Sequence, residues 1–326
     1  MLTLRAIVPA ELADQAEEIL RKAPSMTALT RIRGAAVEPP GDVMTANLER
    51  DAVNDVINAL KGLGVTQEGS LDLTAHETWV SQRALTAEEK SPDTDNVVWA
   101  EVIEQAYAQT RLSGIFITFM ILATLLAAIA VITDSPILVV GAMVLGPEFM
   151  CVVALGLALV RHKRDLLKQS VRTLIVGFTI AITVAVIATE IARFVGLVSI
   201  DDITASRPGV EFIYEPNWWS FIVAVIAASA GVLALTSSMS TGIIGVFISV
   251  TTIPAAGNIA VGTVFGQWDQ VAGSAFQLTI NIVGMALAGW ITLVIRSVMS
   301  HRVSRLLAQR EQRRQLRRQR RAPAPR

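Results

Sequence analysis

Two apolar stretches decide the fold that this sequence predicts, and each is interrupted near its middle. Residues 138–160 read LVVGAMVLGPEFMCVVALGLALV, and residues 242–265 read GIIGVFISVTTIPAAGNIAVGTVF. Proline removes a backbone donor and clashes with the carbonyl four residues earlier, so each stretch should kink or unwind around Pro147 and Pro254. When broken helices occupy matching positions in two halves of a membrane protein, they indicate a polar site at the membrane midplane.

The composition is typical of a membrane protein. Hydrophobic residues make up 52% of the 326 residues and charged residues 17%, and the mean hydropathy is +0.51. Crossing the hydrocarbon core of a bilayer takes about 20 helical residues. From residue 112 onward, six stretches are long enough: 112–132, 136–160, 171–195, 219–236, 242–265 and 271–295. We therefore predict an α-helical polytopic membrane protein whose six-helix transmembrane domain covers residues 112–295.

The six predicted spans fall into two sets of three. Sliding one set onto the other by 107 residues places Pro147 on Pro254 and Gly177 on Gly284, and aligns all three spans without a gap. Because each half has three spans, the second half must enter from the opposite side of the membrane. The sequence thus predicts an inverted 3+3 repeat with two broken helices. The alternative is that apolar spans of similar length align by chance.

Charge is segregated along the chain, although the formal net charge is zero. Residues 1–110 hold 9 Lys or Arg against 18 Asp or Glu, whereas residues 296–326 hold 11 Arg against one Glu. Cationic loops mark the cytoplasmic side of a membrane protein, and here the loop at 161–172 and the tail are cationic. Net negative charge falls in the other loops, at 133–135, 201–215 and 269. Both termini are therefore expected in the cytoplasm, and the start of the chain does not resemble a cleaved signal peptide.

Residues 1–80 are predicted to form a separate cytosolic domain. Strand-like alternation covers 2–8, 27–37, 43–48 and 71–75, and helical spacing covers 12–23 and 53–63. The resulting order, βαββαβ, is that of an α+β ferredoxin-like domain. This fold hosts regulatory, assembly and inert domains alike, so it indicates no ligand.

A linker and a connecting helix are expected at 81–111. Residues 81–96 are polar and charged, and apolar residues then recur at helical spacing from Val98 to Arg111. This amphipathic helix either runs into the membrane or packs on the cytosolic domain.

Several motifs in the membrane region carry a resemblance to a known family. They read DSPILVVGAMVLGP at 134–147, STGIIGV at 240–246, TTIPAA at 251–256 and NIVG at 281–284. These motifs resemble the bacterial hydrophobic membrane proteins grouped as domain of unknown function 389. The resemblance implies a multi-pass protein of the bacterial cytoplasmic (inner) membrane, and it implies no chemistry. Glu148 departs from the apolar residue expected after that proline in much of the family.

Glu148 is the most informative candidate for a site. It lies near the middle of its span, where an unpaired charge costs at least about 2.5–3.5 kcal/mol, so it must be protonated, paired or hydrated. Three interpretations stay open for it: a titrating coupling site or cation ligand, a cap for the broken helix, or a contact at a subunit interface. The predicted substrate- or ion-binding residues are those at and near the two breaks: Gly146, Pro147, Glu148, Pro254, Gly257, Asn258 and Asn281.

Other charged features have simpler interpretations. Glu190 and Arg193 are spaced for a local ion pair near the headgroups. The arginine-rich tail at 296–326 favours contact with anionic lipids over nucleic acid, because it begins at a membrane exit. No span contains a histidine, and the sequence has no phosphate-binding loop, nucleophile motif or Cys/His cluster. The sequence therefore predicts no enzyme, metal or cofactor.

The function that these features predict is secondary transport of a small solute or ion through the lipid bilayer. The main alternative is a sensor or scaffold that signals through its cytosolic domain, and an ion channel is the third. Substrate, direction and homo-oligomer formation stay open at this stage.

Overall fold

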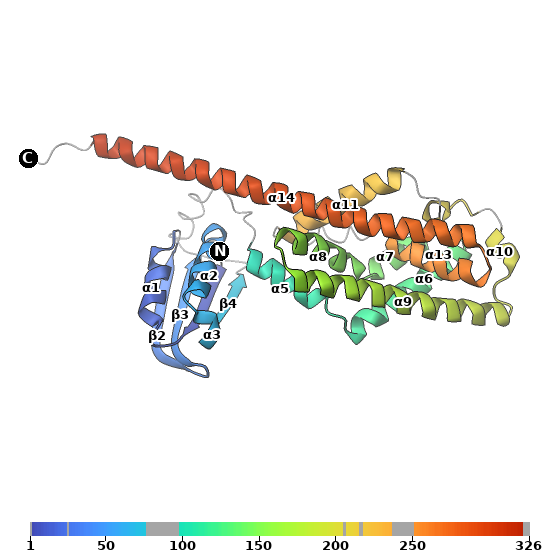
Figure 1. The fold of residues 1–326 in the computed structure, drawn as a ribbon, viewed down its shortest axis with the longest axis horizontal. Helices are drawn as coiled ribbons and strands as arrows, with labels where there is room; N and C mark the ends of the chain where they lie inside the picture. The colour runs from blue at the N-terminus through green and yellow to red at the C-terminus, as the bar shows by residue number, and fades with distance from the viewer. Residues whose placement is uncertain are drawn as a thin grey trace, which may run out of the picture. The chain divides into compact units, whose positions relative to one another are not determined.

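The computed structural model describes residues 2–24, 26–75, 98–204, 207–214, 218–236 and 251–321. The chain forms two compact units (Figure 1). The first contains the residues up to Glu104, and the second contains most of the chain from Gln105 onward. The predicted linker at 81–96 lies outside the described residues.

The first unit is an antiparallel four-stranded sheet with helices. Its strands follow the order β2-β3-β1-β4 across the sheet. Its elements are β1 (Leu2–Val8), α1 (Ala13–Lys22), β2 (Ala28–Val37), β3 (Pro40–Leu48), α2 (Arg50–Gly62), α3 (Val65–Glu68) and β4 (Ser70–Ala75). The predicted order βαββαβ is confirmed, and the short helix α3 is an addition. Sheet order and element order together are those of the ferredoxin-like arrangement.

Strand alternation builds the core of this unit. Leu2, Leu4, Ala6 and Val8 of β1 are buried on one face of the sheet, together with apolar residues of α1 and α2. Val98 is 1% exposed and joins the same core. The domain core therefore recruits a residue that lies beyond the predicted boundary at residue 80.

Helix α5 (Trp99–Gln109) follows Val98 and is the predicted amphipathic helix. Its first residue, Trp99, donates its backbone N–H to Asn54 Oδ1 at 3.0 Å within the first unit. Its last turn belongs to the second unit, where Gln169 Nε2 donates to the Tyr107 carbonyl at 2.9 Å. The interpretation that this helix packs on the first domain is thus supported at its start, whereas its entry into the membrane stays a prediction.

An ion-pair network joins two strands and a helix of the first unit. The Arg31 guanidinium lies 2.7 Å from Asp42 Oδ2 and 2.6 Å from Glu17 Oε2. The backbone N–H of Gly34 donates to Asp42 Oδ1 at 2.8 Å. That N–H, together with the Arg31 charge, outweighs burial and holds the pKa of Asp42 below its usual value.

The second unit is helical throughout its described residues. It comprises α6 (Gly114–Ile132), α7 (Pro136–Leu145), α8 (Glu148–Val160), α9 (Arg164–Phe194), α10 (Ile200–Thr204), the 3-10 turn η1 (Glu211–Ile213), α11 (Trp218–Thr236), α13 (Thr252–Val264) and α14 (Trp268–Arg321). Helix α14 continues beyond the predicted sixth span into the arginine-rich tail.

Three of these helices are long and apolar enough to cross a membrane: α6, α9 and the Trp268–Arg296 part of α14. Helices α7 and α8, which are bent by 55° relative to each other, are together also long and apolar enough to cross a membrane. Helix α11 is apolar but shorter, and α13 covers only part of the predicted fifth span, of which residues 242–250 are not described. The described helices therefore support a membrane protein, whereas the count of six spans stays a prediction.

The outer faces of these helices are apolar. Large hydrophobic side chains are more than 40% exposed on α6, α9 and α14: Phe119, Ile129, Ile175, Ile187 and Ile291. Exposing many large apolar side chains to water is unfavourable, whereas contact with lipid is not.

The predicted proline break is confirmed in the first stretch, whereas residues 242–250 of the second stretch lie outside the described residues. Helix α7 ends at Leu145 and α8 begins at Glu148, so the chain bends at Gly146 and Pro147. Pro254, by contrast, lies in the first turn of α13, and the helix runs without interruption through residues 253–258. Backbone N–H groups in the first turn of a helix have no intrahelical acceptor, so a proline there costs no hydrogen bond. The residues TTIP therefore form the start of α13, and Pro254 does not interrupt this helix.

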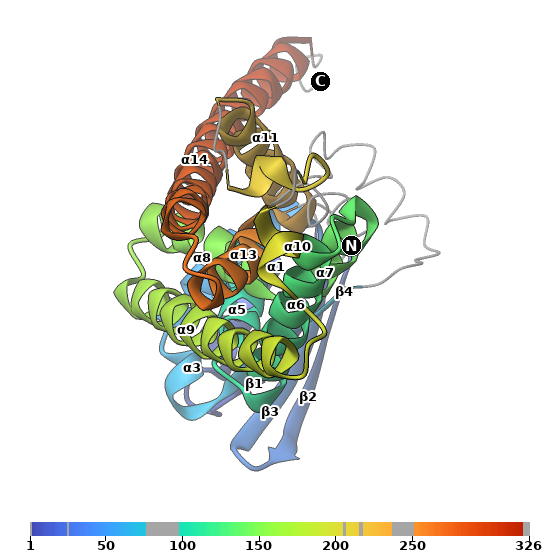
Figure 2. The ribbon, with the colours of Figure 1, turned by 90° about the vertical axis from the view of Figure 1, so that its right-hand side faces the viewer.

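Helix α13 lies at the centre of the second unit. It contacts α6, α9 and α14, and end-on it lies between them (Figure 2). Most of its residues from Thr252 to Gly262 are buried, although the helix is only 13 residues long. A short apolar helix surrounded on several sides by longer ones is held in place by packing.

Candidate functional site

The bend between α7 and α8 brings a carboxylate into the interior of the second unit. Pro147 is the N-cap of α8, and Glu148 is its first residue, with 3% of its surface exposed. Glu148 Oε2 lies directly against Gly146, where a Cβ would overlap it and would also stand 2.7 Å from Ile253 Cγ1. Only glycine leaves room for the carboxylate at this position.

Glu148 joins the first turns of two helices. Thr252 Oγ1 donates a hydrogen bond of 2.6 Å to Glu148 Oε1. Thr252 is the first residue of α13, as Glu148 is of α8, so the amino-terminal ends of both helices meet at this bond. The positive ends of two helix dipoles favour a carboxylate at such a place.

Helix α14 supplies amide side chains to the neighbouring threonine. Asn281 Nδ2 and Gln277 Nε2 donate to Thr251 Oγ1 at 2.8 and 3.2 Å. Residues four apart lie on the same face of a helix, so both amides face α13. We call Glu148, Thr251, Thr252, Gln277 and Asn281 the junction cluster.

The junction cluster has more acceptors than donors. Three of its buried oxygens have no hydrogen-bond partner: Glu148 Oε2, Gln277 Oε1 and Asn281 Oδ1. Their residues are 3%, 0% and 2% exposed. Burying a polar group without a partner is costly, so such atoms require an explanation.

The structure places the other predicted site residues differently. Asn258 lies further along α13 and donates to Ser274 Oγ at 2.8 Å. Gly257 packs against α6, where an added Cβ would stand 2.7 Å from Ala127 Cβ. Pro254 is buried in the first turn of α13. Of the seven predicted residues, Gly146, Pro147, Glu148 and Asn281 therefore lie at the junction.

Sequence reasoning did not single out Thr251 and Thr252. A usable signal was present, because threonine is favoured at the start of helices and two threonines precede Pro254. The expectation of a break at that proline concealed it.

A second buried polar cluster lies around Arg207, which the sequence placed in an acidic loop. Its Nη2 donates to Gln270 Oε1 at 2.7 Å, its Nη1 donates to the Val131 carbonyl at 3.3 Å, and its guanidinium lies 5.6 Å from the centre of the Tyr214 ring. The residue is 4% exposed. Arg207 therefore ties the loop before η1 to the end of α6.

The pair Glu190 and Arg193 is exposed, as expected. The two side chains lie 3.5 Å apart and are 58% and 51% exposed. Arg193 also donates to the Val264 carbonyl at 3.0 Å. Exposed pairs of this kind contribute little to stability.

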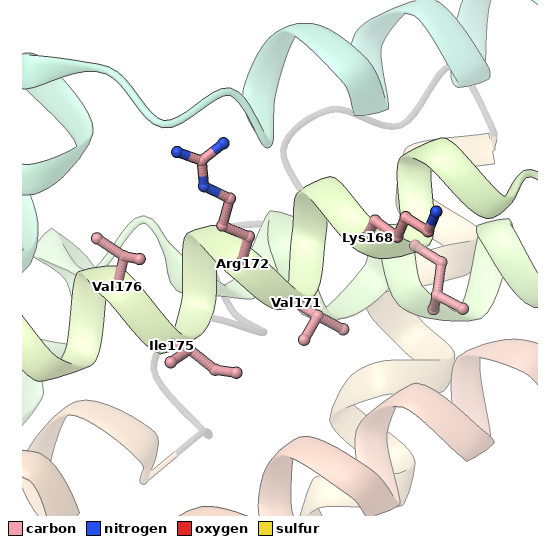
Figure 3. A pocket seen from close by; sticks show the side chains of 6 residues that line it. Lys168, Val171, Arg172, Ile175 and Val176 are labelled. Atoms are coloured by element: carbon pink, nitrogen blue, oxygen red, sulfur yellow. The ribbon is translucent and has the colours of Figure 1, made fainter.

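The surface of α9 carries a groove of about 510 Å³ lined by Leu167, Lys168, Val171, Arg172, Ile175 and Val176. Figure 3 shows Val171 and Ile175 projecting to one side of α9 and Arg172 and Val176 to the other. All six residues belong to one helix, so the groove is part of its outer surface and not an enclosed site.

No metal cluster of the usual kind was found in the described ranges, where no three His, Cys, Asp or Glu side chains gather. The single cysteine, Cys151, is buried. Glu148 is the one carboxylate of the junction cluster, which otherwise offers hydroxyl and amide oxygens.

The apolar helices, the bend in α7 and α8 and the exposed apolar faces define a helical membrane protein. The sequence profile of the family described as Domain of unknown function (DUF389) matches residues 143–287 of the chain. The match contains α8, α9, α11, α13 and most of the membrane part of α14, including all five residues of the junction cluster. The resemblance inferred from the motifs is confirmed.

Among curated proteins, an uncharacterized protein of the archaeon Methanocaldococcus jannaschii is 24% identical over 203 residues. The alignment covers 62% of this chain and 60% of that relative. No solved structure matches the chain. The comparisons thus provide a family and no activity.

Proposed function

We propose that this protein is a secondary transporter of a small solute or ion, with its substrate site at the junction cluster. The observation that carries the proposal is a buried carboxylate, Glu148, joined to Thr252 where two helices begin. Ionisable residues within membrane spans are costly and commonly mark the path of a substrate or ion. Helix ends inside the membrane serve as ligand sites in transporters built from broken helices.

The topology is part of the same proposal. Six spans in an inverted repeat would place both termini in the cytoplasm of a bacterial cell, with the arginine-rich tail against anionic lipids of the inner membrane. The hydrogen bond between the first residues of α8 and α13 supports the repeat, because half-helices related by a two-fold axis in the membrane plane begin near that axis. We propose no enzymatic activity.

A sensor or scaffold is the second candidate. It is supported by the close packing of the junction, where Gly146 and Ile253 leave no room for a methyl group. It is also supported by α5, which carries contacts of the first unit at one end and of the second unit at the other. Under the transport proposal, the packed junction corresponds to an occluded state that must open.

Flux measurements in proteoliposomes test the proposal. Purified protein should move protons or alkali cations at a rate above that of empty liposomes, and Glu148→Gln should abolish the flux or its dependence on pH while the protein stays folded. Glu190→Gln is the matched control, because it removes a carboxylate from an exposed position on α9. Wild-type flux equal to that of empty liposomes for every ion tested would favour the scaffold, and unchanged flux in a folded Glu148→Gln variant would remove the coupling role.

A further inference from the structure

We infer that the junction cluster binds a dehydrated monovalent cation of the sodium class. The inference rests on the proposed function, since it names the ion that the transport site would take. Its starting point is the set of three buried oxygens without partners, contributed by Glu148, Gln277 and Asn281.

These residues belong to one place in the fold. Glu148 is hydrogen-bonded to Thr252, while Gln277 and Asn281 are both hydrogen-bonded to the adjacent Thr251. The three side chains that carry these oxygens are therefore all bonded to one dipeptide, Thr251 and Thr252, at the start of α13. A ligand placed there would meet atoms from α8, α13 and α14.

The chemistry of these atoms selects a cation. All three unpartnered atoms are acceptors, and the only charged group of the cluster is the Glu148 carboxylate, so both the free lone pairs and the charge favour a cation over an anion. The positive ends of the α8 and α13 helix dipoles already face the Glu148 carboxylate. Glu148 lies in the first turn of α8 and accepts a hydrogen bond from Thr252, the first residue of α13. A second anion is therefore not needed there. Helix α7 ends at Leu145, next to the cluster, and the carbonyls of a helix end without intrahelical donors are natural cation ligands.

Charge and size narrow the choice to a small monovalent ion. Divalent calcium and magnesium are usually held by several carboxylates or with retained water, whereas this cluster has one carboxylate. Transition metals prefer imidazole and thiolate, and the cluster contains neither. The close packing at Gly146, where a Cβ would overlap Glu148 Oε2 and stand 2.7 Å from Ile253 Cγ1, favours a small ion.

A proton and a buried water are the competing explanations. One proton on Glu148 would give Oε2 a single hydrogen to donate, so at least one of the two amide oxygens would stay without a partner. A water could donate to two of the three oxygens. A cation accepts lone pairs from several oxygens, and unlike a neutral water it would also compensate the buried carboxylate.

The test is the thermal stability of the purified full-length protein as a function of sodium concentration, with ionic strength held constant by choline chloride. A ligand that binds only the folded state raises the folded-to-unfolded ratio about 100-fold at 100 times its Kd. Wild-type protein and the control Glu190→Gln should therefore melt at a higher temperature as sodium increases. Glu148→Gln and Asn281→Ala should lose this dependence.

Direct binding of radioactive sodium to the wild-type protein, displaced by unlabelled sodium but not by choline, would support the inference even if both variants fail to fold. A melting temperature that is insensitive to sodium, lithium and potassium would overturn it. A response to choline as large as that to sodium would also overturn it, since that result indicates a hydrated cluster without selectivity. Sodium binding without any flux would support the cation site and contradict the transport proposal. Flux without a sodium effect on binding or melting would support transport and contradict the sodium site.

Discussion

Replacing Gly257 by alanine tests whether the close approach of α13 to α6 is essential. Helix propensity and steric overlap change the free energy of unfolding in opposite directions in this variant. Alanine is favoured over glycine inside a helix by about 1 kcal/mol. The new Cβ, however, would stand 2.7 Å from Ala127 Cβ and 2.8 Å from the backbone of Ala127 and Ala128.

The cost of steric overlap should exceed the gain in helix propensity, so the variant should be less stable than the wild type. Carbon atoms pack at about 3.5–4.0 Å, so the two helices would have to separate by about 1 Å. Helix α13 also contacts α9 and α14, so it has no free side toward which to move. Overpacking usually costs about 1–3 kcal/mol, and the atoms met here include backbone, which places the cost at the upper end. The expected net loss is about 1–2 kcal/mol, which corresponds to a fall in melting temperature of roughly 2–8 °C.

The assay is thermal unfolding of the purified protein, with Gly141→Ala as the matched control. Gly141 is also inside an apolar helix, but its added Cβ would lie 3.6 Å from Leu126 Cδ2, an ordinary contact. The control should melt at the wild-type temperature or slightly above it, because only the propensity term applies. The reasoning is refuted if Gly257→Ala is as stable as Gly141→Ala.

Three further predictions concern topology and the first unit. In a Cys151-free background, Ser199→Cys should react with an impermeant thiol reagent outside intact cells and His162→Cys should not; the opposite pattern would reverse the proposed orientation. A fragment of residues 1–104 should unfold cooperatively in a thermal melt. It should be more stable than a fragment of residues 1–80 by roughly 1.5–3 kcal/mol, because only the longer fragment contains the buried Val98. Equal stability would contradict a role of Val98 in the core. The folded-state pKa of Asp42 is lowered, so its contribution to stability is complete above the unfolded pKa of about 4 and is lost as the pH falls below it. As the pH is lowered, the free energy of unfolding of the 1–104 fragment should therefore fall less for Asp42→Asn than for the wild type. Equal losses would contradict a stabilising role of the ionised Asp42.

The sequence predicted the elements whose cause is local. Alternation of apolar residues determines the strands of the first unit, and their order along the chain matches the observed βαββαβ arrangement. Uninterrupted apolar stretches determine α6, α9 and the membrane part of α14. The bend at Pro147 was predictable as well, because the proline lies inside an apolar stretch long enough to be one helix.

At Pro254 the position of the proline within the helix matters, because this residue lies in the first turn of α13. A proline in the first turn is compatible with a helix, whereas one in the interior is not, and the sequence alone does not specify where the helix begins. The extent of the first unit was also not local, since Val98 reaches its core from beyond the linker.

The sequence by itself thus determined several apolar helices, the order of strands and helices in the first unit, and Glu148 as the carboxylate of interest. Only the tertiary structure decided which residues Glu148 meets. Thr252 is 104 residues away along the chain, and Gln277 and Asn281 come from a third helix. Hydropathy and residue spacing indicate which type of element a segment forms and which of its faces is apolar. A hydrogen bond between two helix ends depends instead on how segments far apart in the sequence pack. Three unpartnered oxygens become visible only once that packing is known.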